Sequence, residues 1–162
     1  MIPKSYEDFP KGAIGYVYQT THIPTGKKYV GKKSLIYNIK RKLGKKELAL
    51  HEGKGRPPKF KIVQKESDWK TYYGSHKFIK EEVKKGNQSD FKRVILQCAY
   101  SKKELTYLEN KILFTLAVLE NEDYLNDNIE GRYFKKDFDF SSSFCTFRVW
   151  RKTVYYTYLR AS

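Results

Sequence analysis

Two stretches decide the fold, AIGYVYQT at residues 13–20 and KKYVGKK at residues 27–33, separated by the turn-forming letters HIPTG. Both stretches are rich in β-branched and aromatic residues, which favour strands, and the Pro and Gly between them favour a turn. The sequence therefore predicts an antiparallel hairpin. A four-residue loop at 22–25 would place Tyr18 opposite Tyr29, so both phenols would project from one face.

The remaining elements extend this hairpin into a small mixed domain. The stretch FKRVILQCA (Phe91–Ala99) is apolar through its middle, which predicts a third strand in the centre of the sheet. Helices are expected over 34–50, 74–85 and 101–119. We therefore expect an α/β (α+β) fold, in which helices flank a three-stranded antiparallel sheet formed by about residues 14–20, 27–33 and 91–98.

The composition limits the class of protein. A chain of 162 residues is the size of one domain, and its 14 Tyr and 10 Phe exclude a disordered chain. Two Cys are too few for a disulfide framework or a Cys₄ zinc site. The start MIPKSYEDFP lacks the apolar core of a signal peptide, and the apolar runs are too short for a membrane helix, so we expect a cytoplasmic protein.

The charge indicates a polyanionic partner. Lys and Arg number 33 against 18 Asp and Glu, a formal charge of +15. Residues 40–65 hold ten of these basic residues and two acidic ones, so we expect this segment to contact phosphates and binding to weaken steeply with salt. The candidate DNA-binding residues are Lys33, Lys40, Lys42, Lys45, Lys46, Arg56, Lys59 and Lys61.

One carboxylate lies where an apolar residue is expected. Ser101 and Glu104 have the spacing of a capping box, which begins the helix at 101–119. At 100° per residue the leucines and Ile112 of this helix form a stripe facing the core, and Glu109 falls inside it. A carboxylate at such a position needs a partner.

The hairpin resembles the GIY-YIG nuclease superfamily. Tyr16-Val17-Tyr18 is followed after ten residues by Tyr29-Val30-Gly31, the separation of the two tripeptides in that family, although Tyr16 stands where Gly is usual. The blocks YVGKKSL, RKLGKKEL, KESDWKTYYGSHK, DFKRVIL and ELTYLENKI resemble phage-encoded members. This resemblance implies a nuclease domain over 1–134 with a basic insertion at 40–65. Residues 135–162 would form an aromatic and basic extension packed on the same domain.

The resemblance also implies the roles of individual residues. A metal-dependent, homing-type DNA endonuclease in the host cytoplasm would use Glu109 to bind Mg²⁺, with Mn²⁺ substituting, and no small-molecule cofactor. Arg41, or Lys33 or Lys40 in its place, would contact the phosphate, and Asn126 would support the site. Both phenols would take part around the nucleophilic water. We assign Tyr18 as the base and Tyr29 to positioning, an assignment that the resemblance does not fix. The substrate would be double-stranded DNA, and a homodimer could cut both strands.

Other functions remain open from the sequence. A non-catalytic DNA- or RNA-binding module could keep the same scaffold and use its aromatics for stacking. Glu82-Val83-Lys84 spells a second nuclease-like element, but the surrounding FIKEEVKK predicts a helix, which disfavours it. The three histidines are scattered, which disfavours a histidine-metal site, although His76 could approach the active surface.

Overall fold

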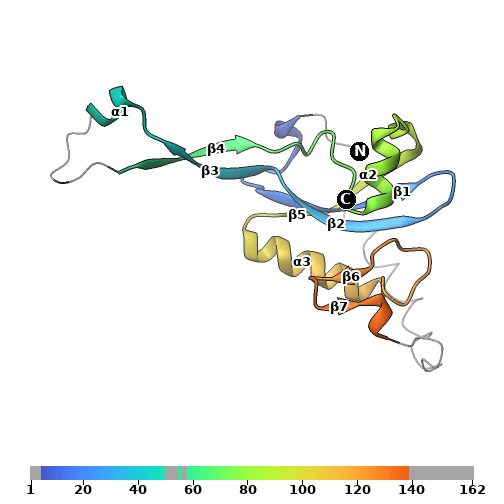
Figure 1. Ribbon diagram of the computed structural model, residues 1–162. Helices are drawn as coiled ribbons and strands as arrows, with labels where there is room; N and C mark the ends of the chain where they lie inside the picture. The colour runs from blue at the N-terminus through green and yellow to red at the C-terminus, as the bar shows by residue number, and fades with distance from the viewer. Residues whose placement is uncertain (1–4, 50–54, 56–57, 139–162) are drawn as a thin grey trace.

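The fold is a mixed α+β domain, as expected. The computed structural model describes residues 5–49, 55 and 58–138. Its main sheet is antiparallel with the order β2-β1-β5, formed by β2 (Lys28–Ser34), β1 (Gly15–His22) and β5 (Phe91–Ala99) (Figure 1). The position predicted for the third strand is confirmed, but its central place is wrong. β1 is central because it is buried along most of its length, whereas β5 alternates with exposed residues as an edge strand does.

Two layers cover the faces of the sheet. Helix α3 (Lys102–Thr115) packs Leu105, Leu108 and Leu113 on the face that carries Val17 and Val30. The opposite face carries Tyr16 and Tyr18, covered by Trp69 and Tyr72 from the segment before α2 (Lys77–Lys84) (Figure 1). The remaining short elements are η1 (Tyr6–Asp8), η2 (Gln88–Asp90), β6 (Asn128–Ile129), β7 (Tyr133–Phe134) and η3 (Lys135–Asp137).

Helix α3 begins as predicted and ends early. The Ser101 side chain accepts from the Glu104 N–H at 3.1 Å, and the Glu104 carboxylate accepts from the Tyr100 N–H at 2.7 Å. The helix stops at Thr115 rather than near residue 119, because Ala117 takes a positive φ of 47° that breaks the helical path. Leu119 is nevertheless buried in the core beyond the helix end.

The hairpin register differs from the prediction by two residues. Tyr18 pairs with Gly31, and Tyr29 pairs with Thr20, because the connection after His22 is longer than four residues. A shift of two keeps the alternation of faces, so both phenols still lie on one face, with ring centroids 6.4 Å apart. Gly31 makes room for them, since a Cβ there would meet the Tyr18 hydroxyl at 2.8 Å.

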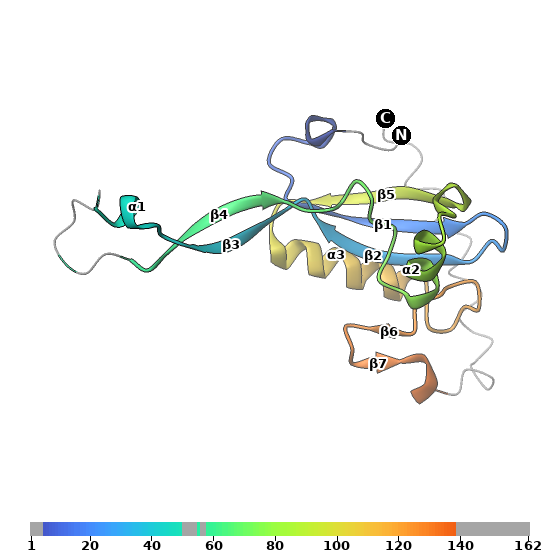
Figure 2. The same cartoon turned by 45° about the horizontal axis from the view of Figure 1, so that its top comes forward.

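The helix expected over 34–50 is wrong. This segment enters a second antiparallel hairpin of β3 (Ile36–Lys42) and β4 (Phe60–Glu66), which projects from the body as an arm (Figures 1 and 2). Helix α1 (Lys45–Ala49) is the helical part of the described segment. The stretch IYNIKRK contains β-branched and aromatic residues, and FKIVQKE pairs with it in register, so cross-strand pairing outweighs the helical preference of the lysines.

A buried arginine holds the segment before α2 on the sheet. Arg93 on β5 is 5 % exposed and donates to the backbone carbonyls of Trp69, at 2.6 Å, and of Tyr72 and Lys70. Its guanidinium lies against the Tyr73 ring, 5.6 Å from the centroid. The planar fork of an arginine carries five N–H donors spread over three nitrogen atoms, whereas the three donors of a lysine ammonium all lie on one nitrogen atom.

Arg93→Lys is therefore expected to lower the free energy of unfolding by about 2 kcal/mol, because carbonyls that the guanidinium satisfies lose their charged donor. Denaturant unfolding followed by tryptophan fluorescence would measure the change. The matched control is Lys92→Arg, the reverse exchange at the exposed neighbouring position, expected to change stability by less than about 0.5 kcal/mol. Equal effects of both exchanges would contradict this role of Arg93.

One sequence expectation lies outside the described residues, namely the packing of the 135–162 extension beyond residue 138. Among the described residues, no helix has the length and apolar character needed to cross a membrane.

Candidate active site

The site forms along the free edge of β2, where the backbone groups of an edge strand need partners. Lys28 is bonded by the chain at 123–125, since its N–H donates to the Asp123 carbonyl and its carbonyl accepts from the Leu125 N–H, both at 2.7 Å. At Val30, the buried Asn126 side chain accepts from the N–H at 3.0 Å and donates to the carbonyl at 2.8 Å. Asn126 thus takes the place of a neighbouring strand. It ties the loop between α3 and β6, called the late loop below, to β2.

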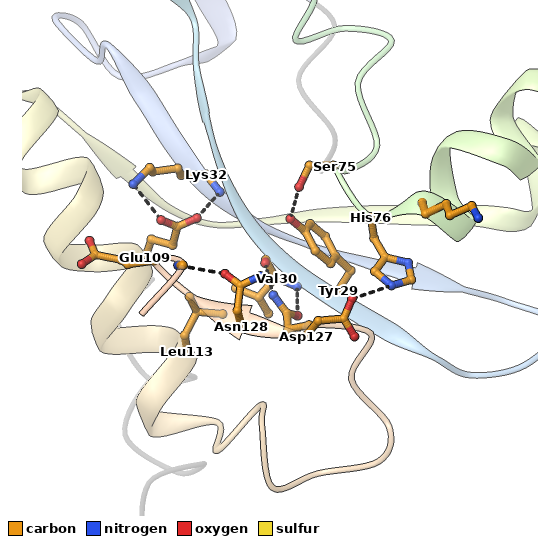
Figure 3. Close-up of a pocket in the computed structure, with 13 residues that line it drawn as sticks. Tyr29, Val30, Lys32, Ser75, His76, Glu109, Leu113, Asp127 and Asn128 are labelled. Carbon is orange, nitrogen blue, oxygen red and sulfur yellow. Dashed lines mark hydrogen bonds and ion pairs between the residues drawn. The ribbon is translucent and has the colours of Figure 1, made fainter. Parts of the chain in front are cut away.

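Glu109 completes this edge. Its Oε1 accepts from the backbone N–H of Lys32 at 3.0 Å, and its Oε2 lies 2.8 Å from the Lys32 ammonium (Figure 3). The Lys32 ammonium also donates to the Thr106 hydroxyl on α3 at 3.0 Å. The partner that Glu109 requires is therefore Lys32, and the carboxylate remains 16 % exposed, within reach of a ligand.

A cavity of about 430 Å³ opens at this edge of the sheet (Figure 3). Tyr29 and Glu109 stand on opposite walls, with β2 between them, and Asn126 contributes from the late loop. These three predicted residues therefore share one cavity. Its lining is Tyr29, Val30, Lys32, Ser75, His76, Lys77, Glu109, Leu113, Asn126, Asp127, Asn128, Glu130 and Gly131.

The Tyr29 phenol is held at the cavity wall. Its hydroxyl hydrogen-bonds with the Ser75 hydroxyl at 2.6 Å, and its ring lies 6.4 Å from the His76 imidazole. Burial raises the pKa of Tyr29 above its ordinary value of 10.0, the Ser75 hydrogen bond opposes this rise, and the negative charge of Glu109 adds to it. The phenol is therefore neutral near pH 7 and can both donate and accept a hydrogen bond.

Tyr18 lies behind Tyr29 rather than in the cavity lining. It is 1 % exposed and packs against Tyr16 and Tyr72, with edge-on ring contacts at 5.9 and 6.1 Å. Burial, followed by the neighbouring phenols, raises the pKa of Tyr18 far above its ordinary value. The two motif tyrosines are thus chemically different, because one meets solvent in a cavity and the other is sealed in the core.

Arg41 does not join the cavity lining. It lies on the arm and pairs with Glu47 of α1, which also binds Lys61. Lys33 is tied to Asp68 at 2.6 Å and covers the Tyr72 ring at 3.7 Å, so it packs on the Tyr18 side of the sheet. The arm carries Lys40, Lys42, Lys45, Lys46 and Lys59, whereas Arg56 lies outside the described residues.

Several cavity residues were not among the sequence candidates. Lys32 follows the second tripeptide directly, and the alternation of β2 gave the signal, because it places Lys32 on the face that α3 covers. Ser75 had no comparable signal. His76 does reach the cavity, where its Nε2 lies 3.3 Å from Asp127. Glu82 lies on α2, as the helix prediction required, and is bound by Lys85 and Asn87.

The cavity lining includes the carboxylates of Glu109, Asp127 and Glu130. Among the described residues, no group of three or more His, Cys, Asp or Glu side chains is arranged to hold a metal ion.

Comparison with known proteins agrees with the motif. Residues 3–129 match the family model described as "Putative endonuclease segE, GIY-YIG domain". No curated protein and no solved structure gave a match. The matched segment covers most of the 162-residue chain, including both tripeptides, Glu109 and Asn126. The chain therefore belongs to the SegE GIY-YIG endonuclease family.

Proposed function

We propose that this GIY-YIG endonuclease is a phage-encoded, homing-type enzyme that hydrolyses phosphodiester bonds of double-stranded DNA with Mg²⁺. The observation that supports the proposal is the cavity at the β2 edge, whose lining includes Tyr29, Glu109 and the Lys32 that pairs with it. An acid, a lysine and a phenol can stabilise charge and transfer protons, as phosphodiester hydrolysis requires.

The residues present fit Mg²⁺. Glu109 is a partly exposed carboxylate at the cavity wall, and Asp127 and Glu130 supply further oxygen atoms to the same lining. Mg²⁺ keeps several waters and commonly needs one or two carboxylates plus a phosphate oxygen. Bound at Glu109, the ion would supply Lewis-acid stabilisation of the phosphoryl oxygens. The Lys32 ammonium pairs with the Glu109 carboxylate. If an ion took that place, the ammonium would be available to contact the phosphate.

The remaining roles follow from position. The ionised form of Tyr29 accepts the proton of the attacking water, and Ser75 holds the phenol in place. Tyr18 supports the Tyr29 ring from the core rather than acting as the base, since its hydroxyl is buried. Asn126 fixes β2 against the late loop, and Arg41 binds DNA from the arm instead of contacting the scissile phosphate.

Incubation of supercoiled plasmid with the protein tests this function. We expect relaxed and linear products with Mg²⁺ or Mn²⁺ and none with EDTA. The affinity of the protein for DNA should fall by orders of magnitude as the salt concentration rises. A duplex competitor should inhibit cleavage more strongly than a single-stranded RNA of equal length. Cleavage that persists in EDTA would contradict the metal dependence, and stronger competition by RNA would favour an RNA-directed function.

The stoichiometry of cleavage can be read in the same assay. Each chain contributes a single copy of the cavity at the β2 edge, so a double-strand break at this site requires two protomers or two successive nicks. If a homodimer forms on DNA, the linear product should rise with the square of protein concentration, without an intermediate nicked circle. Accumulation of nicked circles before linear DNA would instead indicate a monomer that cuts in two steps.

A further inference from the structure

We propose that the β3–β4 arm reads base edges in the major groove through one of its two faces, with Asn38 and Gln64 as the paired residues that recognise adenine. This inference rests on the proposed DNA cleavage and names the recognition element that acts with that cavity. It concerns residues 36–42 and 60–66, all of which the structure describes.

The arm lacks the burial that would stabilise it alone. All seven residues of β4 are exposed, and in β3 only Ile36 is partly buried. An isolated two-stranded hairpin is marginally stable in water. Large apolar side chains such as Phe60 (53 % exposed) and Ile62 (67 %) nevertheless face solvent on it. A long exposed ribbon of this composition is best explained by a partner that covers it.

The charge of the arm selects a polyanion as that partner. The strands and α1 carry Lys40, Arg41, Lys42, Lys45, Lys46, Lys61 and Lys65 against Glu47 and Glu66. The major groove of B-DNA is about 12 Å wide and admits a two-stranded ribbon, whose strands lie about 4.8 Å apart. Shape and charge therefore both match duplex DNA.

The two faces of the arm differ in chemistry. On one face, Arg41 and Lys61 lie opposite each other and both bind Glu47. Hydrogen bonding from Lys61 and from the Gly44 N–H, together with the charge of Arg41, lowers the pKa of Glu47 to about 2, so this carboxylate stays ionised. That face is therefore partly neutralised within the arm itself.

The other face presents free polar groups. Asn38 lies directly opposite Gln64, Lys40 opposite Ile62, and Lys42 opposite Phe60. Within the described part of the chain, neither amide makes a side-chain hydrogen bond, and neither Lys40 nor Lys42 makes an ion pair. Amides bind the N6 and N7 edge of adenine, lysine binds guanine O6 and N7, and apolar groups contact the thymine methyl.

The spacing of these three cross-strand pairs, or rows, along the arm fits the spacing of base pairs in the duplex. Residues two apart on a strand are about 6.7 Å apart, close to two base-pair steps of about 3.4 Å. The three rows would therefore span about four base-pair steps.

Two hydrogen bonds and one buried side chain hold the base of the arm to the main sheet. Leu35 is buried and its N–H donates to the Ile14 carbonyl at 2.8 Å, and the Ser67 N–H donates to the Leu35 carbonyl at 2.9 Å.

This anchoring couples recognition to cleavage. β2, which carries Tyr29 and Lys32, continues through Leu35 into β3, so one short continuous segment joins the cavity residues to the reading face (Figure 2). Eight residues separate Lys32 from Lys40, which corresponds to at most about 26 Å of extended chain. The read base pairs should therefore lie within about one helical turn of the cut.

The test selects bound duplexes from a randomised pool in EDTA, so that binding is measured without cleavage. We expect the full chain to enrich adenine at one or two positions, and Asn38→Ala with Gln64→Ala to reduce that preference about tenfold or more at those positions. The control Lys65→Gln lies on the opposite face and should weaken binding to all sequences alike. An unchanged preference in the double variant, or an even loss across sequences, would overturn the proposal.

A modified base provides a second readout, in which the unsubstituted chain is tested first on altered DNA. Replacing the preferred adenine by 7-deazaadenine removes one acceptor from the major groove alone. Binding of the full chain should fall about tenfold, whereas the double variant, already lacking the amides, should lose less than about threefold. Equal losses would overturn the assignment. Base preference without any cleavage in Mg²⁺ would instead overturn the endonuclease function and leave this inference standing.

Discussion

Glu109→Gln is expected to lower the rate of plasmid cleavage about 10³-fold while leaving the fold intact. Glutamine keeps the side-chain oxygen that accepts from the Lys32 N–H but loses the charge that pairs with the Lys32 ammonium and would bind Mg²⁺. Loss of a preorganised electrostatic group at a phosphoryl-transfer site commonly costs about 10²- to 10³-fold. Single-turnover cleavage at saturating protein measures the chemical step.

The matched control for this variant is Glu104→Gln. Glu104 lies on the same helix and also accepts a backbone N–H, from Tyr100, but it is outside the cavity lining. Both exchanges raise the net charge by one, so a general electrostatic effect on DNA binding would appear in both. Cleavage by Glu109→Gln at the rate of Glu104→Gln would remove Glu109 from the mechanism.

The fold was predictable wherever pairing is local. The first hairpin follows from two β-rich stretches around a turn, and its alternation of faces survives a two-residue error in register. The arm was not predictable in the same way, since β3 pairs with a strand about twenty residues downstream, and the exposed faces of both strands leave no buried pattern. Because these strands show no apolar periodicity, the basic residues over 34–50 indicated a helix instead.

The candidate site was predictable where one element carried the signal. Glu109 stands out on an otherwise apolar helical face, and its partner Lys32 follows from the alternation of β2. Arg41 falls within the helix expected at 34–50 but lies on β3 of the arm, and it does not join the cavity lining. Ser75 reaches the cavity through a loop that Arg93 holds, a contact between segments that no local pattern reveals.

Tyr29→Phe is expected to reduce the rate of cleavage by about 10²- to 10³-fold and to remove its pH dependence. A phenol acts as base only after losing its proton, and burial holds the pKa of Tyr29 above 10.0. The deprotonated fraction therefore rises tenfold per pH unit across pH 6 to 9, and the rate should rise with it. Single-turnover rates measured at fixed ionic strength would give this slope.

Tyr18→Phe separates catalysis from packing, because it removes the same single hydroxyl from the other motif tyrosine. Tyr18 is sealed between Tyr16 and Tyr72, so its phenol meets no water in the cavity. This variant should keep the pH slope and at least about a third of the rate, with the loss confined to stability. The reverse result, a flat profile in Tyr18→Phe and an unchanged slope in Tyr29→Phe, would assign the base to the buried phenol and require the sheet to open before the water is deprotonated. Because the two rings are only 6.4 Å apart, a structural disturbance would affect both variants alike, whereas loss of the slope in one variant alone identifies which phenol titrates.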